Sequence, residues 1–169
     1  MDATAMRHAL SHFGSGLTVV TGLADTGPLG FTCQSFFSLS LDPALVSIAP
    51  SRASTTWPEI RPLTSFAINI LADHQTNHPI AFSRSGTDKF TGVDWRQSKH
   101  GAPHLQDALA VLDCRIWAEY DGGDHTIVAA EVLDFHVNGT GGPLLFYKSG
   151  YAVVSPVPEA PARPSQPVR

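Results

Sequence analysis

The sequence predicts a mainly β fold of the α+β class, an antiparallel barrel with short helices at its periphery. Residues 112–120 alternate between two faces, with Leu112, Cys114 and Ile116 on one and Asp113 and Arg115 on the other. A turn of sequence Asp-Gly-Gly-Asp follows, and residues 125–133 return as the hairpin partner. Other β-rich segments lie at 17–21, 45–49, 66–71 and 144–147. About six strands without alternating long helices favour a barrel, because closure removes exposed edges.

The first half of the chain opens with an apolar stripe that predicts a short helix over residues 3–13, formed by Met6, Ala9, Leu10 and Phe13. Residues 17–21 are rich in β-branched side chains and are expected to form a strand. The Asp-Thr-Gly-Pro turn at 25–28 predicts a hairpin whose second strand starts near Leu29. Residues 66–71 are apolar at both sets of alternating positions, so we expect a strand covered on both faces.

Two further short helices are expected at the edges of the barrel. One starts at Thr56, with Thr56 as the N-cap, Pro58 in the first turn and Glu59 closing a capping box. The other covers residues 80–83, and Pro79 limits how far it extends towards the N-terminus.

Composition and charge restrict the class of protein. Hydrophobic residues make up 43% and charged residues 15% of the 169 residues, as in a globular domain with a substantial core. The net charge of −4 argues against a nucleic-acid partner held by a basic surface. No apolar run reaches the roughly 18 residues of a membrane span, and we expect no secretory signal at the N-terminus.

We expect one domain over residues 1–154, followed by a flexible Pro-rich tail over residues 155–169 that holds five prolines. The two cysteines, Cys33 and Cys114, form no CxxC pair and are interpreted as reduced, partly buried residues. This cysteine usage predicts a cytoplasmic location.

Several kinds of site are disfavoured. His74/His78 and His100/His104 have the i, i+4 spacing of helical metal ligands, but a proline adjoins each pair and interrupts regular helix. We therefore expect surface histidines and no metal site. The chain also lacks a GxSxG nucleophile elbow. It lacks a GxGxxG turn as well, so any nicotinamide must bind without a Rossmann site.

Residues 30–43 place small hydroxyl and amide side chains between aromatic residues. Such a segment can wrap a flat, partly apolar ligand while Thr32, Gln34, Ser35 and Ser38 bond to its polar edges. The alternative is a Ser/Thr-rich strand edge with no ligand.

An anion site is predicted just before the helix that starts at Thr56. The residues there are Ser51, Arg52, Ser54 and Thr55, and a helix N-terminus favours negative charge. Lys89 can add a second positive charge and Phe90 an apolar wall. The alternative is an ordinary capped helix and a solvated lysine.

His125 ends a Gly-Asp-His turn. From the residues alone, it can be a turn histidine that forms a hydrogen bond to a nearby carbonyl.

Seven motifs occur in order along the chain: residues 13–21 (FGSGLTVVT), 32–43, 54–58 (STTWP), 66–71 (FAINIL), 88–90 (DKF), 123–125 (GDH) and 143–147 (PLLFY). Together they resemble the short-chain flavin reductases, the reductase components of two-component flavin monooxygenases. Each motif is weak alone, but the series spans almost the whole chain. The runs at 32–36 and 121–125 are most similar to reductases that serve bacterial aromatic- or steroid-ring hydroxylases.

The resemblance implies an antiparallel Greek-key split β-barrel that is active as a homodimer. It implies an NAD(P)H:flavin oxidoreductase in which NADH or NADPH donates hydride to bound FMN or FAD, and reduced flavin then leaves for a separate monooxygenase. The sequence does not distinguish FMN from FAD or NADH from NADPH. It also does not distinguish a flavin that stays bound as a cofactor from one that diffuses as a substrate. Arg52 and Arg84 are both candidates to contact a 2′-phosphate.

The resemblance also implies roles for individual residues. His125 is the implied catalytic residue, beside the flavin and the nicotinamide, where it orients the dihydropyridine or stabilises charge. The implied flavin-binding residues are Thr32, Cys33, Gln34, Ser35, Ser38, Leu39, Ser51, Arg52, Ala53, Ser54, Thr55, Ser83, Lys89, Phe90 and Tyr151. The alternative function is a flavoprotein of the same barrel that holds flavin tightly and carries electrons without reductase turnover.

Overall fold

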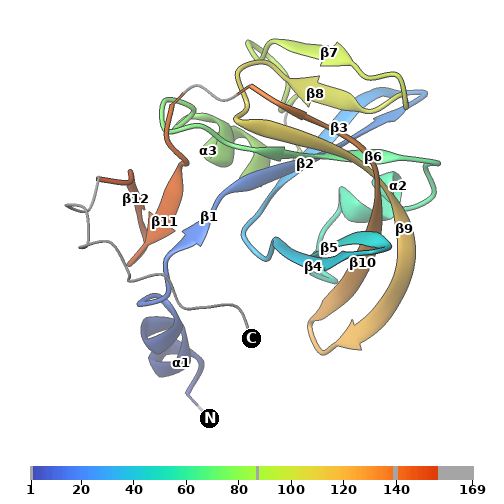
Figure 1. The fold of residues 1–169 in the computed structure, drawn as a ribbon. Coiled ribbons are helices and arrows are strands. Elements are labelled where there is room, and N and C mark those ends of the chain that lie inside the picture. Colours follow the sequence, from blue (N-terminus) through green and yellow to red (C-terminus); the bar gives the residue numbers. More distant parts are fainter. Residues whose placement is uncertain (1, 87, 139–140, 156–169) are drawn as a thin grey trace, which may run out of the picture.

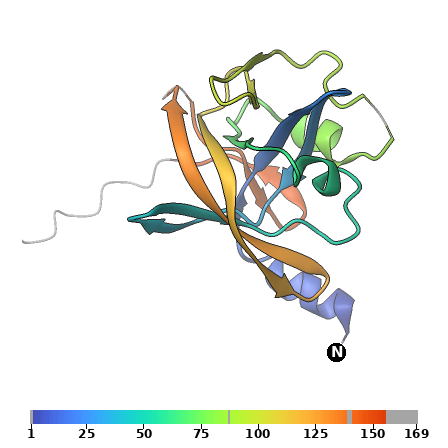
Figure 2. The ribbon, with the colours of Figure 1, turned by 90° about the vertical axis from the view of Figure 1, so that its right-hand side faces the viewer.

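A computed structural model describes residues 2–86, 88–138 and 141–155 of the protein. Its main sheet has seven antiparallel strands in the order β3-β2-β6-β9-β10-β5-β4. They are β2 (Thr18–Ala24), β3 (Gly27–Cys33), β4 (Phe37–Leu41), β5 (Ala44–Ile48), β6 (Phe66–Ile70), β9 (Ala110–Gly122) and β10 (His125–Val137). The sheet curls strongly, and the long β9–β10 hairpin runs across the others (Figures 1 and 2). The prediction of a mainly β antiparallel fold with short helices is confirmed.

Two small sheets and three short helices surround the main sheet. The small sheets join β1 (Ser15–Gly16), β11 (Leu145–Tyr147) and β12 (Gly150–Ala152), and pair β7 (Trp95–Gln97) with β8 (Pro103–Leu105). The helices are α1 (Ala3–Leu10), α2 (Trp57–Ile60) and α3 (His78–Ser83). In the described part of the chain, none of them has the length and apolar character that a bilayer crossing requires.

The edges of the main sheet are β3 and β4, which neighbour one another in sequence. Over the described residues these two strands do not pair, so the main sheet is open between them. The fully closed barrel expected from the number of strands is not formed. The connection between them, residues 34–36, lies at this opening.

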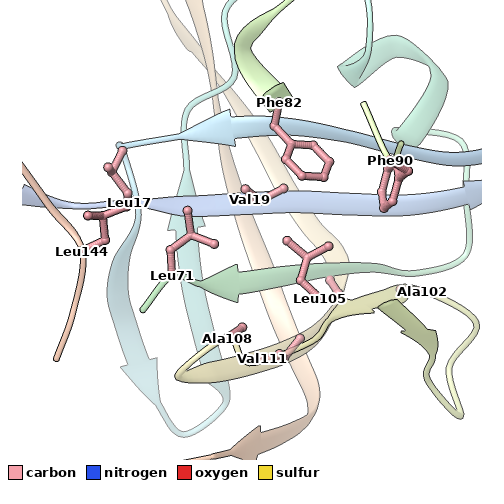
Figure 3. Close-up of a cluster of buried hydrophobic side chains, with 11 residues drawn as sticks. Leu17, Val19, Leu71, Phe82, Phe90, Ala102, Leu105, Ala108, Val111 and Leu144 are labelled. Atoms are coloured by element: carbon pink, nitrogen blue, oxygen red, sulfur yellow. The ribbon is translucent and has the colours of Figure 1, made fainter. Parts of the chain in front are cut away.

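Two clusters of buried apolar side chains form the core. The first lies on one face of β2 and contains Leu17, Val19, Leu71, Phe82, Phe90, Leu105 and Leu144 (Figure 3). The rings of Phe82 and Phe90 meet edge to face, with centroids 5.0 Å apart. The second cluster includes Val20, Ile48, Trp57, Ile60, Phe66, Ile68 and Val128. Because β6 contributes Ala67 to the first cluster and Phe66 and Ile68 to the second, the prediction that its two faces are covered is confirmed.

Near the start of β9, the face that the alternating pattern assigns to solvent is buried as well. Asp113, expected on the solvent side, is 1% exposed. It accepts a hydrogen bond from Ser98 Oγ (2.7 Å) and lies against His104. The β7–β8 hairpin covers this end of the strand (Figure 1), so the expectation of a surface histidine is wrong for His104, which is 7% exposed.

The helix boundaries show two further departures. Thr56 has helical backbone angles and makes no capping bond; Ser54 Oγ instead accepts the N–H groups of Thr56 and Trp57 at 3.3 and 3.1 Å. The predicted capping box with Glu59 is therefore wrong. Pro79 lies in the first turn of α3, where its missing N–H is tolerated, so the helix begins before it.

Helix α1 is present but ends at Leu10, before the predicted end at residue 13, and it buries no side chain. Met6 and Leu10 are exposed, and Phe13, just beyond the helix, is 81% exposed. Figure 1 shows α1 standing away from the main sheet. The predicted tail lies outside the described residues from 156 onwards.

Both cysteines are buried and free. Burial, and to a lesser extent the charge of Asp113, raises the pKa of Cys114 to about 12. At pH 8 roughly one Cys114 in ten thousand is then a thiolate, the form that reacts. In a Cys33→Ser variant we expect the remaining thiol to react with a disulfide reagent only as fast as the protein unfolds. Rapid labelling of the folded variant, compared with the same protein in urea, would contradict this burial.

Candidate functional site

A cleft of about 570 Å³ opens where the end of β3, the loop after β5, the end of α3 and the start of β10 meet. This volume is in the range of small-molecule sites. The lining residues are Phe31, Thr32, Cys33, Gln34, Ser35, Ala49, Pro50, Ser51, Ala53, Ser54, Thr55, Thr56, Phe82, Ser83, Ser85, Lys89 and His125. Eleven of these, from Thr32 to His125, are residues that the sequence had singled out.

The segment after β3 is held in place by its own hydroxyls. Ser35 Oγ accepts the N–H of Ala49 at 2.7 Å, which ties the β3–β4 connection to the end of β5. Thr32 Oγ1 donates to the carbonyl of Pro79 at 2.8 Å and so fixes α3 beside the cleft. Gln34 is exposed. Since these two hydroxyls bond within the protein, backbone groups and Gln34 are left to meet the polar edge of a ligand.

Lys89 holds three segments together at the rim of the cleft. Its ammonium donates to Gly30 O (2.9 Å), Thr56 Oγ1 (3.1 Å) and Phe82 O (3.3 Å). Burial lowers the pKa of Lys89, an effect that the charge of Glu59 partly offsets. All three protons are thus shared with neutral acceptors. Lys89 can therefore attract an anion in the cleft by its positive charge, but it has no N–H left to donate to it.

The loop after β5 is attached to the start of β10. Ser51 forms a β-bridge with His125, Thr126 N donates to Pro50 O (3.0 Å), and Arg52 N donates to Asp124 O (2.9 Å). The helix that follows, α2, has only four residues, so its dipole is a smaller attraction for an anion than the sequence argument assumed.

His125 is oriented by its neighbour. Its Nδ1 lies 2.7 Å from Asp124 Oδ1, and the hydrogen bond from the imidazole, followed by its charge, lowers the pKa of Asp124. Because an ionised carboxylate can only accept, the imidazole donates from Nδ1, which leaves Nε2 for a ligand. The backbone bridge to Ser51 holds this pair beside the cleft.

Five of the predicted site residues lie elsewhere. Ser38 and Leu39 are exposed on β4, and Phe90 is a core residue packed on Phe82 and Trp95. Tyr151 packs its ring against Phe146 on the β11–β12 pair, with centroids 5.9 Å apart. Arg52 donates to Asp121 Oδ1 at 2.8 Å and lines a second cavity instead.

That second cavity, about 520 Å³, lies on the other side of the same loop. It shares Ser51 and Ser54 with the cleft and is also lined by Trp57, Arg61 and Tyr120.

Six cleft residues were not predicted: Phe31, Ala49, Pro50, Thr56, Phe82 and Ser85. Phe31 is one of the aromatic residues of the 30–43 segment, and Thr56 is predicted as a helix N-cap, so the sequence marks both positions for another role. Phe82 and Ser85 flank Ser83 and carried no signal of their own.

The fold and the cleft define a small β-sheet protein with a cleft of small-molecule size near the open edge of its sheet. Residues 10–155 match the family model of the flavin reductase like domain, and the chain belongs to this family. The family predicted from the seven motifs is therefore confirmed.

Three relatives illustrate the match. The chain is 38% identical over 164 residues to the reductase subunit HsaB of a flavin-dependent monooxygenase from Mycobacterium tuberculosis, covering 96% of this chain and 88% of that protein. It is 39% identical over 145 residues to the NADH-dependent FMN reductase SmoA of Agrobacterium fabrum, covering 86% and 82%. The NADH:FAD oxidoreductase SgcE6 of Streptomyces globisporus, solved with NAD and FAD fragments, superposes with a TM-score of 0.87 at 33% identity, covering 92% and 94%. The predicted enzyme class, a flavin oxidoreductase, is confirmed.

Proposed function

We propose that this protein uses NADH or NADPH to reduce FMN or FAD and releases the reduced flavin to a separate monooxygenase. The observation that supports this most directly is the cleft between β3, the 49–56 loop and His125, together with the family match over residues 10–155. We assign the reductase activity to a domain formed by residues 1–154.

The cleft residues fit a flavin in character. Half-buried Phe31 supplies apolar surface for a ring system, while Gln34 and the backbone of residues 32–35 supply polar contacts at its edge. Ser51, Ser54 and Thr55, with the positive charge of Lys89, suit the phosphate at the other end. Bound flavin supplies the hydride acceptor, and the chain supplies its position and the exclusion of water.

His125 is proposed to contact the dihydronicotinamide. Its Nε2 is directed by the bond from Nδ1 to Asp124, so the imidazole can orient the carboxamide or the ring at the mouth of the cleft. Hydride transfer itself needs no protein base, so this role is one of positioning and charge stabilisation.

We also propose a homodimer. Apolar side chains are exposed on α1 and on β4, where Phe37, Leu39 and Leu41 are 54%, 50% and 92% exposed. Large apolar side chains exposed together on one strand are typical of an interface. Light scattering of the purified protein tests the proposal, and a monomer at all concentrations would contradict it.

We also propose a partner protein and a cellular location. Relatives named as reductase components of monooxygenases support a separate oxygenase as the recipient of reduced flavin. The two free thiols fit a reducing compartment, and we place the protein in the cytoplasm.

The test is a steady-state assay that combines both nicotinamides with FMN, FAD and riboflavin. We expect oxidation of at least one nicotinamide that depends on added flavin and shows saturation. Failure to oxidise NADH and NADPH with every flavin would overturn the proposal. A protein that remains yellow after dialysis and shows no turnover would instead be the electron-carrying flavoprotein.

Lys89 gives a separate prediction. We expect Lys89→Met to destabilise the fold by about 2 kcal/mol, since three acceptors lose a charged donor in a partly exposed setting. Flavin with a phosphate should also bind more weakly, whereas riboflavin should be affected less. Urea unfolding and fluorescence titrations measure the two effects. Equal loss of affinity for FMN and riboflavin would exclude a phosphate role.

A further inference from the structure

A cluster of histidine and aspartate side chains lies at the far end of the β9–β10 hairpin from the cleft. His100 belongs to the turn between β7 and β8, Asp113 to β9 and Asp134 to β10. One potential ligand atom from each of these side chains lies within 4.8 Å of the other two. Figure 1 shows the β7–β8 pair beside this end of the long hairpin, which explains how His100 reaches it.

Two carboxylates in this cluster are direct neighbours across the hairpin. Asp113 and Asp134 are paired in the β9–β10 register, so their side chains emerge from opposed positions. Like charges directly opposite one another destabilise a strand pair unless a cation lies between them. Asp113 is almost completely buried, which makes this repulsion more costly than it would be at the surface.

The imidazoles beside these carboxylates have unused nitrogens. His100 Nε2 is buried and has no hydrogen-bond partner among the described residues. His104 is 7% exposed, and its Nε2 lies 3.1 Å from Asp113 Oδ2 without the alignment of a hydrogen bond. Buried polar atoms are nearly always paired, so two buried imidazole nitrogens in one neighbourhood that make no hydrogen bond to the described residues indicate a missing partner.

The existing contacts leave room for such a partner. Lys99 Nζ lies 2.9 Å from Asp134 Oδ2, but both side chains are substantially exposed, and pairs of this kind contribute little. Ser98 Oγ donates to Asp113 Oδ1 at 2.7 Å, which orients the carboxylate and still leaves it lone pairs.

We propose that His100, Asp113 and Asp134 bind a divalent transition-metal ion, with Zn²⁺ as the preferred ion. One imidazole and two carboxylates suit Zn²⁺ better than Ca²⁺ or Mg²⁺, which prefer oxygen ligands. Ligand bonds of about 2.1 Å require ligand atoms roughly 3.4 Å apart in a tetrahedral site. Side-chain rotations that move the three ligand atoms by about 1 Å would bring them to this spacing. Water would fill the fourth position, and Ser98, whose Oγ donates to Asp113 Oδ1, would orient that carboxylate from the outer shell.

The ion would join the β7–β8 hairpin to the main sheet and stabilise the fold. Asp134 is nine residues along β10 from His125, roughly 30 Å along the strand, so the site is separate from the flavin cleft. The proposal therefore predicts an effect on thermal stability that does not depend on reductase turnover.

The experiment starts from purified protein treated with EDTA and freed of the chelator. Added Zn²⁺ is expected to bind with one-to-one stoichiometry in calorimetry and to raise the Tm in proportion to the logarithm of its concentration. His100→Ala and the conservative Asp134→Asn should each bind Zn²⁺ at least about tenfold more weakly and lose most of the Tm increase. His74→Ala, which removes an exposed histidine of another segment, should behave as the unmodified protein.

Two outcomes overturn the proposal. One is an unmodified protein whose Tm does not respond to Zn²⁺. The other is the same Zn²⁺ affinity in Asp134→Asn and His100→Ala as in the unmodified protein, which would place the bound ion elsewhere. Asp134→Asn keeps the size of the side chain and breaks an ion pair between two partly exposed side chains, so this variant provides the comparison if His100→Ala proves unstable.

Discussion

Replacing His125 with alanine is expected to lower kcat for NADH oxidation by about tenfold or more, while flavin affinity changes by less than about threefold. The imidazole lies at the mouth of the cleft and is held by Asp124 at 2.7 Å and by the bridge to Ser51. Its loss would leave the dihydronicotinamide without a fixed partner, while the residues proposed to contact the flavin remain. Stopped-flow kinetics separates nicotinamide binding from hydride transfer.

His136→Ala is the matched control, because His136 lies on the same strand and is exposed. We expect it to retain full turnover. A His125→Ala variant with unchanged kcat, or with flavin affinity reduced in parallel with kcat, would contradict a positioning role towards the nicotinamide. Asp124→Asn should give a smaller loss, since the amide can still bond to Nδ1 but carries no charge.

The largest loss of stability is expected for Asn69→Ala. Asn69 is fully buried on β6, and its amide donates to Val19 O and Thr21 Oγ1, both at 3.0 Å, while its Oδ1 accepts Leu105 N at 2.8 Å. The substitution removes all three bonds and leaves the buried Leu105 N–H without its acceptor, while Thr21 Oγ1 keeps its bond to Pro103 O. We expect the free energy of unfolding to fall by about 3 kcal/mol, or Tm by roughly 10 °C.

Asn77→Ala removes an exposed amide that makes no capping bond at the start of α3, and it should change stability by less than about 0.5 kcal/mol. Urea unfolding of both variants by circular dichroism gives the comparison. A loss below about 1 kcal/mol for Asn69→Ala would show that the bonds between β6, β2 and β8 contribute little to the fold.

Sequence patterns predicted the strands because local alternation and turn residues identify them. The pairs β2–β3 and β9–β10 formed around the predicted turns. The alternation on β9 nevertheless failed at Asp113, since a pattern assigns residues to two faces but does not say what covers each face. That cover comes from β7–β8, whose three-residue strands are too short to leave a periodic signal.

The cleft was predicted in outline for a different reason. The runs at 32–35 and 51–55 combine small polar residues that end strands or begin a helix, and both segments line it. Side-chain direction was not accessible from such runs. Phe90 follows Lys89 directly but points into the core, and Arg52 turns away towards Asp121.

The histidine pairs show a second limit of sequence spacing. His100 and His104 were weighed only as a helical i, i+4 pair and set aside because Pro103 interrupts a helix, whereas the structure places them on a turn and a short strand. Their neighbours are the aspartates at 113 and 134, which only the pairing of distant strands brings within reach.

Helix α1 has eight residues and no buried side chain, too little to persist by itself in water. The helix must then be stabilised by contact with another surface, which in the proposed homodimer is the second subunit. Hydrogen exchange at the backbone amides of residues 3–10 therefore reports formation of the dimer. Deuterium uptake there should be fast in dilute solution and should slow as the concentration rises, even though the rest of the sheet is unchanged.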